Sequence, residues 1–186
     1  GGLTDPAAEL AESLRDAGVR GIAGDLLVDS SFFDATYLHN EWELSDREKW
    51  YAAPISGLSI HRNCLTVEYD GHRGLPSARI ATSAKGYSVS GTIKGAMNSN
   101  EFKVGALRPD ENLSVRVFGS MGTGVGPERR DVPVVDPARF FGACLHEQID
   151  RMAIDFEGNV RLDPGVGKAL NGLQELVRFE TPLSLA

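Results

Sequence analysis

The sequence has few cysteines, no long apolar run and no cluster of basic residues, and each shortage excludes a class of protein. With only Cys64 and Cys144 among 186 residues, a disulfide-rich scaffold is excluded, while one bridge and two free thiols both remain open. No stretch approaches the roughly 20 apolar residues of a membrane-spanning helix, so no transmembrane segment is expected. The 19 basic and 26 acidic residues give a net charge of -7, and the longest basic run is Arg129-Arg130, which argues against a nucleic acid partner.

The motifs of serine acyl-transfer enzymes are also missing. The chain contains no Ser-x-x-Lys, no Ser-x-Asn and no Lys-Thr-Gly. Thr82-Ser83-Ala84-Lys85 comes closest to the first but has threonine in place of serine, and Gly57-Leu58-Ser59-Ile60-His61 lacks the last glycine of a nucleophile elbow. Since acyl transfer needs a nucleophile, a base and an oxyanion pocket together, no residue of this chain is predicted to be catalytic.

Two motifs suggest small-molecule chemistry but favour simpler interpretations. The spacing Gly-x-Gly-x-Gly over 122–126 is typical of a phosphate loop, yet the charged segment 127–131 follows it instead of an apolar helix, so we expect a flexible hairpin loop. Four carboxylates lie among aromatic residues between 41 and 51, as in a glycosidase acid pair, but a solvated loop explains them equally well. The acidic residues are Glu41, Glu43, Asp46 and Glu48, and the aromatic ones Trp42, Trp50 and Tyr51.

A metal centre is not expected either. His61-Arg62-Asn63-Cys64 has a ligand-like gap, but a structural zinc site needs four ligands and no second pair follows. We expect His39 and His72 in exposed loops and His146 on the flank of a helix. No cofactor is predicted.

Asp5-Pro6 and Asp136-Pro137 predict the starts of two helices, because aspartate is a preferred N-cap and proline fits the first helical turn. The first helix is expected near 6–17, with Gly18 as a left-handed stop, and the second near 137–152. The apolar run 22–28 predicts a strand buried on both faces.

Between the helices, short alternating segments separated by glycine, asparagine and proline predict antiparallel strands. We expect strands at 65–69, 87–93, 102–106 and 113–118, a turn at 157–159 within a short strand segment 154–162, and a further strand at 173–179. The fold class is therefore α/β, a small sheet with two helices on one face and an inserted antiparallel β-rich domain. The predicted domains are a discontinuous one over 1–64 and 133–186 and an insert over 65–132.

Two blocks of sequence carry a resemblance to a known family. Gly21-Ile-Ala-Gly-Asp-Leu-Leu-Val-Asp-Ser-Ser-Phe-Phe-Asp34 resembles the segment after the nucleophile region of class C low-molecular-mass penicillin-binding proteins, the D-alanyl-D-alanine carboxypeptidase/endopeptidase family of the penicillin-binding protein 4 type. The segment 50–59, Trp-Tyr-Ala-Ala-Pro-Ile-Ser-Gly-Leu-Ser, followed by Asn63-Cys64-Leu65-Thr66-Val67, is similar to the next block of that family. More loosely, 134–141, 152–158 and Thr181-Pro182-Leu183-Ser184 resemble its later segments.

The resemblance implies that the catalytic motifs lie outside this chain, Ser-x-x-Lys before it and Ser-x-Asn and Lys-Thr-Gly after it. The expected partner is then the catalytic transpeptidase-like domain of the same parent chain, with peptidoglycan as a second candidate, in the periplasm or in exported form. The loop 41–51 is one candidate surface for the cell wall, and a spacer or docking role is the other interpretation. Two alternatives stay open, a free-standing binding domain of the same fold and an independent hydrolase that uses the carboxylate cluster.

Overall fold

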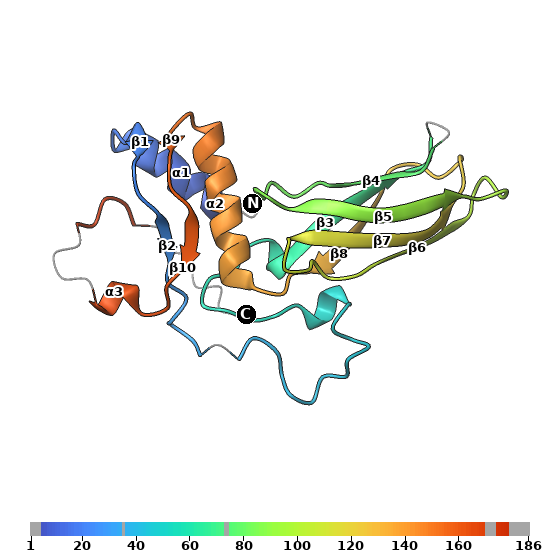
Figure 1. Ribbon diagram of the computed structural model, residues 1–186, viewed down its shortest axis with the longest axis horizontal. Helices are drawn as coiled ribbons and strands as arrows, with labels where there is room; N and C mark the ends of the chain where they lie inside the picture. Colours follow the sequence, from blue (N-terminus) through green and yellow to red (C-terminus); the bar gives the residue numbers. More distant parts are fainter. Residues whose placement is uncertain (1–4, 35, 73–74, 170–173, 179–186) are drawn as a thin grey trace, which may run out of the picture.

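The computed structural model describes residues 5–34, 36–72, 75–169 and 174–178, and arranges them in a helical half and a β half (Figure 1). The helical half holds α1 (Pro6–Asp16), β1 (Gly21–Ile22), β2 (Leu26–Val28), α2 (Pro137–Arg151), β9 (Asp155–Phe156), β10 (Val160–Leu162) and α3 (Val166–Ala169). The β half holds β3 (Cys64–Asp70), β4 (Ser77–Ile80), β5 (Ser88–Gly95), β6 (Phe102–Ala106), β7 (Ser114–Met121) and β8 (Glu128–Pro133). Two short 3-10 helices, η1 (Trp50–Ala52) and η2 (His61–Asn63), lie between them in the chain.

Local capping chemistry forms the two long helices where the Asp-Pro pairs predicted them. The Asp5 side chain accepts hydrogen bonds from the backbone N–H groups of Ala7 and Ala8 at the start of α1. At the other end, Gly18 has φ +91°, and the backbone N–H of Val19 reaches back to the carbonyl of Leu14, which is the Schellman arrangement. Both helices and the glycine stop are thus confirmed.

The strand expected over 22–28 is wrong as a single, fully buried element. It is split into β1 and β2 by Gly24 and Asp25, and Leu27 is 39% exposed. Each piece pairs on one side only, β1 with β9 and β2 with β10, both in parallel. The interruption arises because Asp25 turns its carboxylate to the backbone N–H of Asn159 and to Arg161, across the 157–159 turn. Helix α2 packs on these strands, and α1 packs on α2.

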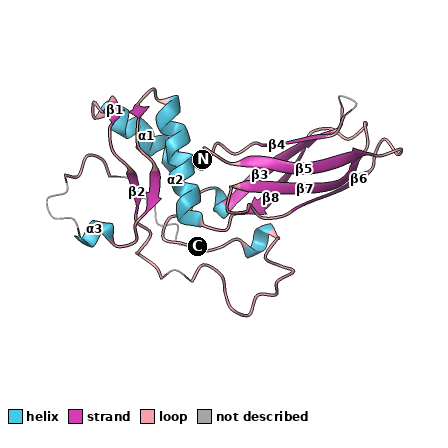
Figure 2. Cartoon of the chain, viewed as in Figure 1, coloured by secondary structure: helices cyan, strands magenta, loops and turns pink. Residues whose placement is uncertain are grey.

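The β half consists of two three-stranded sheets with the orders β4-β3-β8 and β5-β7-β6 (Figure 2). Three of its four strand pairs are antiparallel, as expected, but β5 and β7 run parallel over 88–95 and 114–121. The intervening β6 pairs with the other side of β7, so the chain crosses the sheet between β5 and β7. The sequence did not predict β4 or β8. The fold class, a mixed α/β chain with small sheets and few helices, is confirmed.

The buried side chains of both halves form one continuous core. Phe140 and Ile149 of α2, Leu65 and Val67 of β3 and Val115 of β7 are all fully buried in this cluster. The tail departs from expectation: α3 forms at 166–169, and residues 174–178 are not in a strand, while the rest of the expected strand and 181–184 lie outside the described residues. Among the described residues, no helix is long and apolar enough to cross a membrane.

Candidate functional site

A cleft lies where the N-terminus of α1 meets the β4-β3-β8 sheet. Its volume is about 640 Å³. It is lined by Asp5, Pro6, Ser59, Ile60, His61, Arg62, Thr66, Ala81, Thr82, Ser83, Arg129 and Asp131. The lining therefore brings together the first helical turn, the turn before β3, the loop after β4 and the charged strand β8, which are far apart in the sequence.

A strained turn, η2, presents two side chains to this cleft. His61, Arg62 and Asn63 have φ angles of +49°, +57° and +54°, the left-handed region that costs a non-glycine residue about 1–2 kcal/mol. Three such residues in succession persist only where the surrounding structure holds them. The strain is therefore a marker of a position that the fold maintains against local preference.

The side chain of Asn63 holds this turn together. Only 4% of Asn63 is exposed, and its amide nitrogen donates to the carbonyl of Pro54 at 2.8 Å and to Oγ of Ser59 at 3.0 Å. Its Oδ1 accepts from the backbone N–H of Ile60 at 3.3 Å. Asparagine tolerates the left-handed conformation better than other residues with a side chain, so this position suits both roles.

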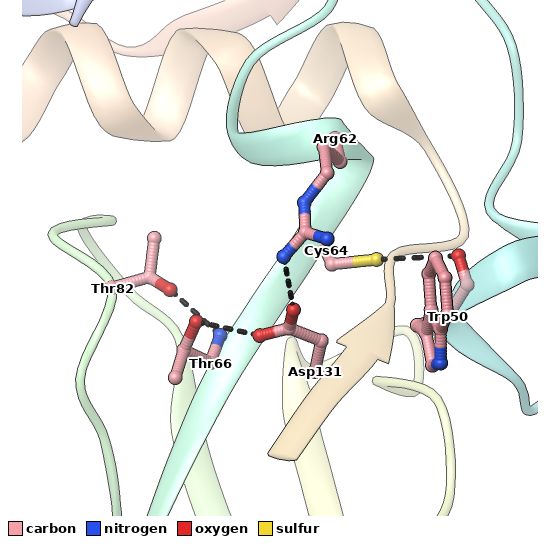
Figure 3. Close-up of polar contacts among 6 residues, drawn as sticks. All are labelled: Trp50, Arg62, Cys64, Thr66, Thr82 and Asp131. Carbon is pink, nitrogen blue, oxygen red and sulfur yellow. Dashed lines mark hydrogen bonds and ion pairs between the residues drawn. The ribbon is translucent and has the colours of Figure 1, made fainter. Parts of the chain in front are cut away.

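A chain of hydrogen bonds orients Arg62 at the mouth of the cleft (Figure 3). The backbone N–H of Thr66 donates to Oγ1 of Thr82 at 2.7 Å, and Oγ1 of Thr66 donates to Asp131 at 2.9 Å. The second oxygen of Asp131 receives the Arg62 guanidinium at 2.5 Å. The guanidinium carbon also lies 5.8 Å from the centre of the Trp50 ring, within cation–π range.

The remaining charged side chains of the cleft lie around this series of hydrogen bonds. Nε2 of His61 lies 3.7 Å from Oδ2 of Asp5. Arg129 binds Glu68, which also binds Arg79, and the hydrogen bond from Arg129 with that from Arg79 lowers the pKa of Glu68 below its ordinary value. Arg129 is thus engaged by a carboxylate outside the cleft.

Neither thiol is activated for nucleophilic attack. Burial raises the pKa of the Cys64 thiol to about 11 and raises that of Cys144 further. Both cysteines are free and buried, so they are two separate thiols and not a disulfide bridge. Since the thiolate is the reactive form, both groups are packing residues.

The structure separates the near-match to Ser-x-x-Lys. Thr82 lines the cleft, where its hydroxyl oxygen accepts from Thr66. Lys85 forms an ion pair with Asp150 of α2 and is not among the lining residues. In the other near-match, Oγ of Ser59 donates to the carbonyl of Ser56. These contacts are structural.

The glycine-rich loop joins β7 to β8, which belong to different sheets, so the expected hairpin is wrong. The backbone N–H groups of Gly122 and Gly124 donate to the carbonyls of Glu101 and Ser99. The loop therefore packs against the connection between β5 and β6. His39 and His72 are exposed and His146 is partly buried on α2, as predicted. No group of three or more possible metal ligands occurs among the described residues.

Residues 41–49 of the acidic and aromatic loop lie on the long connection between β2 and η1, and Trp50 and Tyr51 begin η1 (Figure 1). None of these residues lines the cleft, although Trp50 contacts the lining residue Arg62. Glu48 accepts from the backbone N–H of Arg108, and Asp46 accepts from the hydroxyl of Tyr51 at 2.8 Å. Glu43 accepts from the hydroxyl of Ser45, so three of the four carboxylates accept hydrogen bonds from described residues. Trp50 and Tyr51 are 56% and 58% exposed.

Sequence reasoning missed the cleft and its oriented arginine. In the sequence, Arg62 stands between two possible metal ligands, and Asp131 ends the charged segment 127–131. Neither position indicates a shared cleft. The available signal was Asn63, a residue that favours left-handed turns, placed just before a strand. The pairing of β8 with β3, which brings Asp131 to Thr66, has no local signal.

The sequence of this chain is similar to that of a known peptidase family. The sequence profile of the D-Ala-D-Ala carboxypeptidase 3 (S13) family matches residues 3–172. The chain is 27% identical, in an alignment 169 residues long, to a D-alanyl-D-alanine carboxypeptidase of Actinomadura sp. (strain R39), and the match covers 84% of this chain and 30% of that protein.

Two crystal structures of penicillin binding protein 4 from Haemophilus influenzae share the fold. One is matched with a TM-score of 0.66 and 20% identity, over 83% of this chain and 35% of that one. The other, a complex with a β-lactam, is matched with a TM-score of 0.56 and 18% identity, over 84% of this chain and 32% of that one. The chain thus spans about a third of the length of the relatives it matches.

Proposed function

The chain belongs to the D-Ala-D-Ala carboxypeptidase 3 (S13) family, and we propose that it is the non-catalytic accessory region of a serine-type D-Ala-D-Ala carboxypeptidase that trims peptidoglycan stem peptides. The observation that carries the proposal is a family match over 3–172 in a chain without Ser-x-x-Lys, Ser-x-Asn or Lys-Thr-Gly. The region positions the catalytic cleft or contacts the cell wall.

The partner in this proposal is the catalytic transpeptidase-like domain of the same parent chain, in the periplasm or in exported form. The chain covers about a third of its relatives, which supports a parent protein with further domains. We also propose that 65–132 is an inserted domain within 1–64 and 133–186. The confinement of both three-stranded sheets to Cys64–Pro133 supports this division.

A labelling and turnover experiment tests the absence of catalysis. The purified chain is incubated with fluorescent penicillin and, separately, with Nα-acetyl-L-Lys-D-Ala-D-Ala, with the Actinomadura carboxypeptidase as the active control. We expect no covalent label and no released D-alanine, because the chain has no serine–lysine pair to form an acyl-enzyme. Labelling of the chain itself would refute the proposal. Release of muropeptide products that depended on Glu41 or Asp46 would instead favour an independent hydrolase.

A second experiment tests whether the region contacts the wall. The chain is mixed with purified peptidoglycan sacculi and sedimented, with bovine serum albumin as the non-binding control. Co-sedimentation supports wall contact, and its absence leaves positioning of the catalytic cleft as the role. The sequence of the parent gene separates an accessory region from a free-standing binding domain, because only the former has the three catalytic motifs in the flanking segments.

A further inference from the structure

We call the cleft between the N-terminus of α1 and the β4-β3-β8 sheet the junction cleft. Its lining residue Arg62 is held in a fixed direction but retains hydrogen-bond donors that no described residue binds. One amino group of its guanidinium binds Asp131, and its Nε and other amino group have no hydrogen-bond partner among the described residues. The side chain is 70% exposed despite its ion pair and its contact with Trp50. A guanidinium that is oriented on one edge and open on the other is prepared to receive a planar anion through two parallel hydrogen bonds.

The fold maintains this arrangement against local strain. The left-handed backbone at 61–63 aims the Arg62 side chain, and Asn63 fixes the turn through three hydrogen bonds. Thr66 in turn fixes the carboxylate of Asp131. Backbone strain concentrated beside a cleft is typical of a ligand site.

The other charges of the cleft decide which anion fits. The lining holds Asp5 and Asp131 beside Arg62 and Arg129, and both arginines are already paired with carboxylates, so the spare positive charge suits a single carboxylate better than a doubly charged phosphate. Oδ2 of Asp5 accepts no hydrogen bond from the described residues and lies 3.7 Å from His61. The cleft therefore offers one free donor group and one free acceptor, which suits a ligand that carries a carboxylate together with N–H groups.

We propose that the junction cleft binds a short peptide, with the peptide carboxylate on Arg62 and its amide or ammonium N–H groups facing Asp5. Resting on the proposed function, the peptide is a stem peptide of peptidoglycan that ends in D-alanine.

Calorimetric titration of the full 186-residue chain tests this inference. The probe is Nα-acetyl-L-Lys-D-Ala-D-Ala, and the matched ligand is the same peptide with a C-terminal amide. We expect the acid to bind and the amide to bind at least about tenfold more weakly, because the amide loses the charge-assisted bonds. Arg62→Gln should reduce the affinity for the acid by about the same factor.

Arg79→Gln is the control variant, because Arg79 is 66% exposed, is paired with a carboxylate as Arg62 is, and lies outside the cleft. It should leave the affinity unchanged. Asp5→Asn should weaken binding while α1 stays intact, since asparagine is an equally good N-cap. Circular dichroism of each variant confirms that the fold is retained.

Several outcomes overturn the inference. No binding of the acid at millimolar concentration, equal binding of acid and amide, or an unchanged affinity in Arg62→Gln would each remove the site. Equal binding of an L-Ala-L-Ala peptide would remove the assignment to peptidoglycan. A failure to bind peptide in this titration would not contradict the proposed accessory role. That role is tested separately by penicillin labelling, so the two proposals can fail independently.

Discussion

Replacing Asn63 by alanine should remove a large part of the stability of the fold. The substitution deletes three hydrogen bonds, to Pro54, Ser59 and Ile60, in a site that is 4% exposed. At about 0.5–1.5 kcal/mol each, with further cost for buried groups left without partners, the loss amounts to roughly 3–4 kcal/mol. Alanine at φ +54° adds about 1 kcal/mol, because asparagine is better tolerated there. The free energy of unfolding should fall by about 4–5 kcal/mol.

Urea denaturation followed by circular dichroism measures this change, with Asn112→Ala as the control. Asn112 is exposed and its side chain makes no hydrogen bond among the described residues, so that variant should stay within about 0.5 kcal/mol of the wild type. A loss below about 1.5 kcal/mol in Asn63→Ala would refute the argument that this side chain holds the turn.

A glycine at the same position separates the strain from the hydrogen bonds. Asn63→Gly loses the same three bonds but adopts φ +54° without a Cβ penalty. It should therefore be about 1 kcal/mol more stable than Asn63→Ala, the reverse of the usual order of alanine and glycine. If alanine proves the more stable of the two, the turn is not left-handed in solution.

Three further outcomes are expected from other parts of the molecule. Gly91→Ala should lower Tm by several degrees, because φ is +91° and the added Cβ would lie 2.1 Å from a carbonyl oxygen of the paired strand. Backbone hydrogen bonds from Gly165, Ser31 and Gly167 hold the pKa of Asp29 well below its ordinary value of 3.8, so the stabilisation is present above about pH 4 and is lost as the pH falls. The Tm difference between Asp29→Asn and wild type should be present at pH 6 and shrink below pH 4. Cys64 and Cys144 should react with a thiol reagent at pH 8 only after unfolding, because burial raises both pKa values, and rapid labelling of the native chain would contradict this.

Features that depend on neighbouring residues were predictable from the sequence. Asp5 and Asp136 cap α1 and α2 as expected, because a cap is complete within one helical turn. The strand at 102–106 matches β6 residue for residue. The resemblance of 21–34 and 50–67 to a peptidase family was confirmed by the family profile over 3–172.

Features that depend on distant pairing were not predictable. The strand β8 reads Glu-Arg-Arg-Asp-Val-Pro, a pattern without apolar alternation, and it forms because β3 supplies partners such as Glu68 for its arginines. The split of 22–28 depends on the approach of Gly158, where a Cβ would lie 2.0 Å from the carbonyl oxygen of Gly24. Neither contact can be predicted from a short segment of the sequence.

The cleft combines both kinds of information, which explains why its chemistry emerged only from the structure. The turn at 61–63 is local, but its strain is tolerable only because Asn63 binds Pro54 across the chain. The direction of Arg62 is set by Asp131, which lies 69 residues away and arrives through β8. The cleft nevertheless brings a strained turn, an oriented guanidinium and an Asp5 oxygen that accepts no hydrogen bond from the described residues into one lining. Packing alone would be satisfied by an unstrained turn, so the cost of this one argues for recognition of a ligand.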